Sequence, residues 1–232
     1  MSYKAYIFDM DGTVLNTLDD LNAAMNYALK ACGYRHDMTG EETRFFFGSG
    51  ASVAASRALA YVSGTPLSDL LVIGTPEDTI TPTLDPEEAA RLENVFRPYY
   101  KVHCTDQTAP YPGIPEAIRT LREKGILTAV VSNKPDEAVQ ALVKDQFDGL
   151  FDFALGEKKG IARKPAPDML ETCLHILQVS PEEAVYIGDS EIDLLTAAAG
   201  GLDCIAVTWG FRSRAFLEEH GAETIIESAG EL

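Results

Sequence analysis

In the second half of the chain, short apolar runs alternate with longer stretches in which apolar residues recur at helical spacing. Short runs bounded by polar sequence are typical of the buried strands of a parallel sheet, and the stretches between them are typical of crossover helices. The strands are expected at 126–131, 151–155, 184–187 and 204–207, and the helices at 136–147, 168–178, 191–199 and 212–219. This alternation predicts βαβ units with right-handed crossovers and helices on both faces of the sheet.

The first half contains one comparable apolar run, residues 5–8, and then sequence with helical periodicity. Helices are expected at 17–31, 51–61 and 86–100. A loop rich in Thr, Pro and Gly, with at most one short helical turn, is expected at 63–85. Because one strand is separated from the others by mainly helical sequence, we interpret that sequence as an insertion.

The expected fold class is therefore α/β, with a Rossmann-like three-layer core around a central parallel sheet and an inserted all-helical cap domain. The core domain is expected to comprise residues 1–15 and 100–232, and the cap domain residues 16–99. The 232 residues are 46% hydrophobic, which is enough to build a sizeable buried core.

The composition narrows the classes of partner. The formal net charge is -17, so the chain is expected to repel nucleic acid and anionic membrane surfaces. No apolar run is long enough to cross a membrane, and acidic residues interrupt the N-terminal sequence where a signal peptide would be apolar. The four cysteines lack zinc-site spacing and are expected to be reduced thiols. These features predict a cytoplasmic protein, with a monomer and a homodimer both open.

Polar residues follow several of the predicted strands directly. Asp9 and Asp11 follow the run at 5–8, Ser132 follows the run at 126–131, and Asp189 follows the run at 184–187. Lys164 lies in an Arg-Lys-Pro loop that follows the strand expected at 151–155. Because ligands of open parallel sheets bind at the carboxyl ends of the strands, we expect these side chains to converge.

The order of these residues resembles the haloacid dehalogenase superfamily of phosphatases, motif by motif. The chain matches its four motifs with Asp9-Met10-Asp11-Gly12-Thr13, Ser132-Asn133, Lys164-Pro165, and Gly188-Asp189-Ser190 followed by Asp193. Each position has an ordinary alternative, since Asp and Ser after a strand often form turns or cap helices. All four motifs in order make the resemblance strong, and it covers the whole chain.

The resemblance implies that Asp9 is the nucleophile that attacks phosphorus. Asp11 is expected to protonate the leaving oxygen and then to activate the water that hydrolyses the aspartyl-phosphate. Ser132 and Asn133 would bind the phosphoryl group at the start of a helix. Lys164 would neutralise charge on Asp9 and on the phosphoryl group, so that Ser132 and Lys164 serve both catalysis and substrate binding.

The resemblance also implies a Mg²⁺ cofactor, because a carboxylate attacks a dianionic phosphate poorly unless a metal offsets the repulsion. The expected ligands are the carboxylates of Asp9 and Asp189 and the backbone carbonyl of Asp11. Asp193 and Thr13 are expected behind these ligands, with Asp193 ordering Lys164 or a metal-bound water.

Two features indicate a branch of the superfamily. The dehalogenases of the superfamily lack the second aspartate of the first motif, which is Asp11 in this chain. The placement of the helical insert resembles that in phosphoglycolate phosphatase, pyrophosphatase and beta-phosphoglucomutase. The cap segment that contains Gly48, Ser49 and Gly50 is similar to the cap loop of the phosphoglycolate phosphatase group, and its backbone N–H groups are expected to bind substrate. An ordinary helix-start loop is the alternative. Arg57 is interpreted as a surface residue rather than as a carboxylate clamp.

The expected function is magnesium-dependent hydrolysis of a small, phosphoglycolate-like phosphate monoester. A phosphomutase of the beta-phosphoglucomutase type, a pyrophosphatase and a catalytically silent scaffold on the same fold are the alternatives. A cap that closes over the site would admit a small ester and exclude proteins and nucleic acids.

Overall fold

The computed structural model describes residues 3–232, which form two compact units. The core unit comprises residues 3–16 and Ala109–Leu232, and the cap unit comprises Thr17–Thr108. The predicted boundary between residues 99 and 100 falls inside helix α4 (Pro86–His103). That helix continues because Tyr100 is buried and stacks on Phe96 within the cap unit, with ring centroids 5.3 Å apart.

The core unit is built on a six-stranded sheet in which all neighbouring strands pair in parallel. In spatial order the strands are β5 (Phe153–Glu157), β4 (Leu127–Pro135), β1 (Ala5–Phe8), β6 (Ala184–Gly188), β7 (Asp203–Val207) and β8 (Thr224–Ile226). The helices are α5 (Ile114–Glu123), α6 (Asp136–Gln146), α7 (Asp168–Leu177), α8 (Glu191–Gly200) and α9 (Arg214–Glu219). The α/β fold class predicted from the alternating pattern is confirmed.

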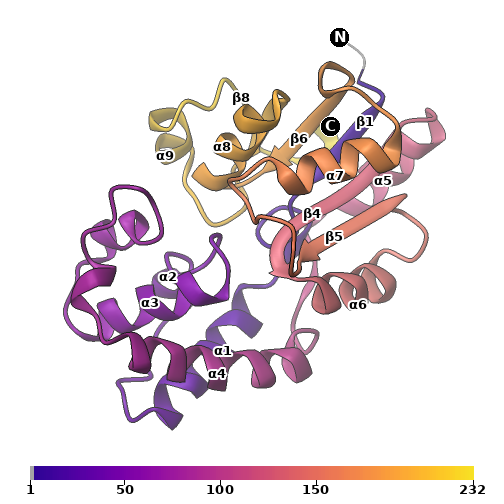
Figure 1. Cartoon of the computed structure of the whole chain (residues 1–232). Coiled ribbons are helices and arrows are strands. Elements are labelled where there is room, and N and C mark those ends of the chain that lie inside the picture. The colour runs from indigo at the N-terminus through magenta and orange to yellow at the C-terminus, as the bar shows by residue number, and fades with distance from the viewer. Residues whose placement is uncertain (1–2) are drawn as a thin grey trace. The chain divides into compact units, whose positions relative to one another are not determined.

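Alternate residues along the strands supply two separate apolar layers. Phe8, Val130 and Ile187 pack on one face of the sheet, in a cluster that includes residues of α5 and α6. Ile7 and Val131 pack on the other face with residues of α7 and α8 (Figure 1). Because successive side chains of a strand point to opposite faces, the near-continuous apolar runs fill both layers and make the three-layer core.

Strand β1 lies in the middle of the sheet, between β4 and β6. The chain order reverses at this strand, because β4 and β5 extend the sheet on one side while β6, β7 and β8 extend it on the other. Such a switch point leaves a crevice beyond the carboxyl ends of the central strands. The loops that follow β1, β4 and β6 therefore meet at the position where open α/β sheets bind ligands.

The regular secondary structure of the cap unit, residues 17–108, is helical, and loops join the helices (Figure 1). It contains α1 (Leu18–Ala31), α2 (Gly40–Thr43), α3 (Ala51–Val62), α4 and two short 3-10 helices, Leu67–Val72 and Thr81–Thr83. Helix α4 packs against both α1 and α3. None of the helices described here has the length and apolar character needed to cross a bilayer.

The sequence pattern missed α2, α5 and β8 and placed the start of α9 too early. Ile114, Ile118 and Leu121 do recur at helical spacing on the buried face of α5, but the helix is short. Strand β8 has only three residues, too few for a periodic signal. Helix α9 begins at 214 rather than 212, because the side chain of Ser213 accepts a hydrogen bond from the Phe216 N–H and caps it.

Candidate active site

Four of the predicted residues form one buried group beyond the carboxyl ends of β1 and β6, which we call the carboxylate–lysine cluster: Asp9, Lys164, Asp189 and Asp193. Asp9 follows β1, Asp189 follows β6, and Asp193 lies in the first turn of α8. Lys164 comes from the loop that precedes α7. Residues far apart in the sequence thus converge as the topology of a parallel sheet predicts.

The ammonium group of Lys164 is held by three oxygen atoms. It lies 3.0 Å from Asp9 Oδ1, 2.8 Å from Asp193 Oδ1 and 2.9 Å from the Tyr186 hydroxyl. The Tyr186 hydroxyl in turn donates to the backbone carbonyl of Val131 at 2.9 Å, so its oxygen faces the lysine as an acceptor. Burial alone would lower the pKa of Lys164, but the carboxylates of Asp193 and Asp9 raise it well above its usual value, and the lysine is a fixed cation.

Asp9 is a carboxylate in an environment that opposes its charge. Burial raises the pKa of Asp9 to about 6, against the lowering influence of Lys164. Although Asp9 Oδ1 lies at ion-pair distance from Lys164, it has no hydrogen bond of acceptable geometry. A buried carboxylate oxygen without a hydrogen bond is costly unless a ligand binds it. Asp9 therefore has the character of a reactive or ligand-binding group rather than of a structural one.

Asp189 is fixed in place by two hydrogen bonds. The Thr13 hydroxyl donates to Asp189 Oδ1 at 3.0 Å, and the backbone N–H of Phe211 donates to Oδ2 at 2.7 Å. Burial raises the pKa of Asp189 well above its usual value, and the nearby Asp193 and Asp9 raise it further. Thr13 thus contacts this carboxylate directly.

Asp193 closes the start of α8 and orders Lys164 at the same time. Its Oδ2 accepts hydrogen bonds from the Ser190 hydroxyl at 2.7 Å, from the Ser190 N–H at 3.1 Å and from the Asp189 N–H at 3.2 Å. Its Oδ1 accepts from Lys164. Asp193 Oδ2 therefore accepts three hydrogen bonds and Oδ1 is paired with the Lys164 ammonium, whereas each oxygen of Asp189 accepts only one hydrogen bond. Asp193 thus supports the cluster and has less capacity than Asp189 to bind a cation.

Carboxylate oxygens of Asp9, Asp189 and Asp193 lie within 4.8 Å of one another, close enough to share a cation. Hard oxygen donors of this kind suit Mg²⁺, which usually takes one or two carboxylates and retains several waters. Asp9 and Asp189 are the members with remaining capacity, and the Asp9 oxygen that lacks a hydrogen bond fits this use. The carboxylate of Asp11 is outside this group, because its Oδ1 accepts a hydrogen bond from Lys134 at 2.7 Å.

Three glycines allow this close packing. A methyl group added at Gly12 would lie 2.3 Å from Asp189 Oδ2, and one at Gly210 would lie 2.3 Å from the Asp189 Cβ. A methyl group at Gly188 would lie 2.2 Å from the Asp193 Cβ. Gly12 also has a φ of +83°, in the left-handed region that favours glycine. Gly12 in the Asp-Gly-Thr sequence therefore permits the turn and also leaves the space that Asp189 occupies.

Replacing Gly12 with alanine is expected to displace Asp189 and to lower phosphatase activity by about 100-fold or more, because sub-ångström misplacement of site groups is costly. Gly125→Ala is a matched control, since Gly125 has a φ of +77° but nothing within 4 Å of an added Cβ. Alanine at either position is strained by the positive φ, but only at position 12 does its Cβ clash with Asp189. Equal activities of the two variants in a phosphate-release assay would contradict the role assigned to Gly12.

The second motif contributes scaffolding as well as polar groups. The Asn133 side chain donates from Nδ2 to the Lys164 carbonyl at 3.0 Å and accepts from the Lys164 N–H at 2.9 Å, and so fixes the lysine loop. Ser132 is buried, and its Oγ accepts a hydrogen bond from the Lys134 N–H at 3.3 Å. Both lie within β4, which continues beyond the predicted end at 131 to Pro135.

Gly48, Ser49 and Gly50 belong to the cap unit, whereas the site residues described above belong to the core unit. Gly48 and Gly50 have φ values of +114° and +85°, and Gly50 is the N-cap residue of α3. The prediction that these residues bind substrate stays a prediction. The interpretation of Arg57 as a surface residue is wrong. Its side chain is fully buried, and it donates to Ser49 Oγ at 3.3 Å and to the Ile73 carbonyl at 3.0 Å.

Sequence reasoning missed Tyr186 and Lys134. Tyr186 lies within an apolar strand, where an aromatic residue normally signals core packing. Lys134 follows the Ser-Asn pair directly, and its position at a predicted strand end was the one available signal. Each contacts a loop residue that is distant in the chain, Lys164 for Tyr186 and Asp11 for Lys134, and the sequence does not display these contacts.

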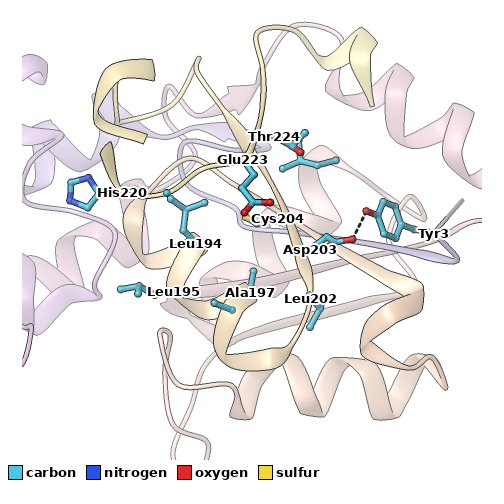
Figure 2. Close-up of a pocket in the computed structure, with 13 residues that line it drawn as sticks. Tyr3, Leu194, Leu195, Ala197, Leu202, Asp203, Cys204, His220, Glu223 and Thr224 are labelled. Atoms are coloured by element: carbon cyan, nitrogen blue, oxygen red, sulfur yellow. Dashed lines mark hydrogen bonds between the residues drawn. The ribbon is translucent and has the colours of Figure 1, made fainter. Parts of the chain in front are cut away.

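A surface cavity of about 620 Å³ lies elsewhere on the core unit, between α8 and the segment around β7 and β8. Figure 2 shows Leu194 and Leu195 along one side and the Tyr3 hydroxyl directed at Asp203, to which it donates at 2.6 Å. The lining residues include no member of the carboxylate–lysine cluster. This cavity is therefore separate from the candidate active site.

The fold and the site together define an α/β protein with a buried cluster of carboxylates and a lysine beyond the carboxyl ends of its central strands. The sequence matches the family model for haloacid dehalogenase-like hydrolases over residues 6–207, and the chain belongs to that family. The resemblance to the haloacid dehalogenase superfamily is confirmed.

Relatives and solved structures agree with this assignment. The chain is 30% identical to phosphoglycolate phosphatase of Mannheimia succiniciproducens over 99% of this chain and 96% of the relative. It superimposes on a crystal structure from Lactobacillus delbrueckii subsp. bulgaricus that is provisionally assigned as phosphoglycolate phosphatase. The TM-score is 0.97 and the sequence identity 53%, and the match covers 100% of this chain and 97% of the other. CbbY from Rhodobacter sphaeroides, solved with phosphate, matches with a TM-score of 0.70 at 27% identity, over 99% and 96% of the two chains. The protein is a phosphatase of this family.

Proposed function

We propose that the protein hydrolyses a small, phosphoglycolate-like phosphate monoester in a magnesium-dependent reaction with a covalent phosphoryl group on Asp9. The observation that carries the proposal is the position of Asp9, buried beside the Lys164 cation and Asp189, with one carboxylate oxygen lacking a hydrogen bond. A carboxylate of this kind is suited to attack phosphorus when neighbouring positive charge offsets the repulsion.

In the first step, Asp9 forms a bond to phosphorus while the bond from phosphorus to the ester oxygen breaks. Asp11 donates a proton to the departing oxygen, which leaves as an alcohol. In the second step, Asp11 accepts a proton from the water that attacks phosphorus, and inorganic phosphate and Asp9 are released. Lys164 balances the charge of Asp9 and of the phosphoryl oxygens throughout, and Asp193 and Tyr186 hold its ammonium in place.

Asp9 and Asp189 would hold the magnesium ion, with the Asp11 carbonyl as the further ligand implied by the family. When bound, the ion supplies positive charge that screens the nucleophile from the phosphoryl oxygens. Thr13 and the Phe211 N–H orient Asp189 for this purpose. Ser132, which lies within β4, would bind phosphoryl oxygens.

The choice of substrate rests on similarity. The M. succiniciproducens relative is named phosphoglycolate phosphatase, and the chain spans nearly its full length. Phosphate binding in the CbbY structure supports a phosphate ester as the substrate class. The formal charge of -17 also favours a small ester, because a large polyanion would be repelled.

The test is phosphate release from a panel that contains 2-phosphoglycolate, sugar phosphates, inorganic pyrophosphate and 4-nitrophenyl phosphate. We expect activity to require Mg²⁺, to fall below detection in a chelator and to return when Mg²⁺ is added. We also expect the highest kcat/KM on 2-phosphoglycolate. A preference for pyrophosphate, or isomerisation of a sugar phosphate without phosphate release, would contradict the proposal and would favour the pyrophosphatase or the phosphomutase alternative.

A further inference from the structure

A second lysine lies at the carboxyl end of β4, beside Asp11. The Lys134 side chain is only 2% exposed, and its Nζ donates to Asp11 Oδ1 at 2.7 Å. It follows Ser132 and Asn133 directly, within the stretch between Val131 and Pro135 where the pairing of β4 with β5 is irregular. The contact forms because β1 and β4 are neighbouring parallel strands, so the loop after β1 lies next to the end of β4.

Burying an ammonium group is costly, and a buried pair often contributes little net stability. Lys164 already supplies the cation next to Asp9. The burial of Lys134 against Asp11, the other aspartate of the first motif, therefore needs its own explanation. The surroundings of Asp11 offer one, because its backbone is held in place while its side chain, which is 18% exposed, can still turn about its own bonds.

The backbone around Asp11 is fixed by local contacts. Asp11 forms an isolated bridge with Leu15, and the Gly12 N–H donates to the Leu15 carbonyl at 2.9 Å. These bonds set where the Cα of Asp11 lies but leave its carboxylate free to turn about the side-chain bonds. The Lys134 contact removes this freedom, since its ammonium binds one particular oxygen.

We propose that Lys134 is a positioning residue for Asp11: by binding Oδ1 it directs Oδ2 toward the departing oxygen of the substrate. The inference rests on the proposed function, in which Asp11 donates that proton and later accepts one from water. The proton is carried on Oδ2, because Oδ1 accepts from the ammonium group. It passes to the ester oxygen as the bond between phosphorus and that oxygen breaks and the bond between phosphorus and Asp9 forms.

This role predicts a dependence on the leaving group. An alkyl alcohol is a poor leaving group and needs a proton in the transition state, whereas 4-nitrophenolate leaves without one. General acid catalysis typically contributes about 10²–10⁴-fold. Loss of the positioning contact in Lys134→Met is expected to slow the first turnover of 2-phosphoglycolate by about 30-fold or more. The first-turnover release of 4-nitrophenolate should slow by less than about threefold.

The experiment measures first-turnover rates of both esters, in Mg²⁺, for the wild type, Lys134→Met, Lys134→Arg and Asp11→Asn. Lys124→Met, a change of the same kind at an exposed position, controls for the loss of charge. Lys134→Arg keeps a cationic donor and is expected to recover part of the rate on 2-phosphoglycolate. If Lys134→Met does not fold, Lys134→Gln is measured in its place, because it retains a donor with shorter reach.

The outcomes separate the two levels of the proposal. If Asp11→Asn slows both esters equally, Asp11 is not the acid and the proposed mechanism fails. If Asp11→Asn selectively slows 2-phosphoglycolate but Lys134→Met slows both esters equally, the mechanism stands and Lys134 has only a structural role. A leaving-group dependence shared by both variants, with partial recovery in Lys134→Arg, supports the inference.

Discussion

Replacing Asp9 with asparagine is expected to lower phosphate release by at least about 10⁴-fold, because the nucleophile is lost and neighbouring groups cannot replace it. Asparagine has the same shape as aspartate, so the buried position after β1 stays filled. It also removes a charge that burial disfavours, as the raised pKa of Asp9 indicates. The fold is therefore expected to persist while turnover is lost.

Three measurements check this result. Phosphate release from 2-phosphoglycolate gives the loss of activity, and circular dichroism shows whether the variant is folded. Hydroxylamine trapping of a phosphoryl group should succeed with the wild type and fail with Asp9→Asn. Asp148→Asn, at an exposed position, is the matched control and should retain full activity. Residual activity of Asp9→Asn above about one-tenth of wild type would exclude Asp9 as the nucleophile.

Replacing Lys164 with methionine is expected to lower the free energy of unfolding by about 3–5 kcal/mol, in addition to abolishing turnover. The change leaves Asp9 and Asp193 buried without their cation. Removing one partner of a buried ion pair is strongly destabilising, because the remaining charge is desolvated and unpaired. The three acceptors that converge on this ammonium make the loss larger than at a surface pair.

Urea denaturation in the presence of a chelator measures this effect without a contribution from bound metal. Lys159→Met, at an exposed position, should change the free energy of unfolding by less than about 0.5 kcal/mol. The double variant Lys164→Met with Asp193→Asn should cost less than the sum of the single changes, because it removes both charges of one pair. Additive effects would show that the two side chains are not coupled.

The outline of the fold could be predicted because it depends on local pattern. Apolar runs such as 184–187, followed by amphipathic stretches, have few stable arrangements other than a parallel sheet covered by helices. The positions of Asp9 and Asp189 at strand ends, together with the fold class, also predict that the two meet. Helix α5 and strand β8 were missed because a short element depends on the contacts it makes with the rest of the unit.

The burial of particular side chains could not be predicted in the same way. Arg57 lies on a helix of small apolar residues. The sequence does not show that this side chain is buried among backbone carbonyls, which belong to Phe45, Phe46, Leu71 and Ile73. Tyr186 has the pattern of a core residue, and its hydroxyl contacts Lys164 only because the lysine loop packs on that face of the sheet. Such contacts join segments that are distant in the chain.

The sequence by itself determined the fold class, the family, and the set of acidic and basic residues from which a phosphatase site can be built. The tertiary structure decided which atoms of those residues meet: Lys164 with Asp9, Asp193 and Tyr186, and Lys134 with Asp11. The physical reason is that periodicity and motif order are properties of short stretches of chain. The partner of a buried charge is set by strand order and by the packing of loops beyond the sheet, which arise only when the whole unit folds.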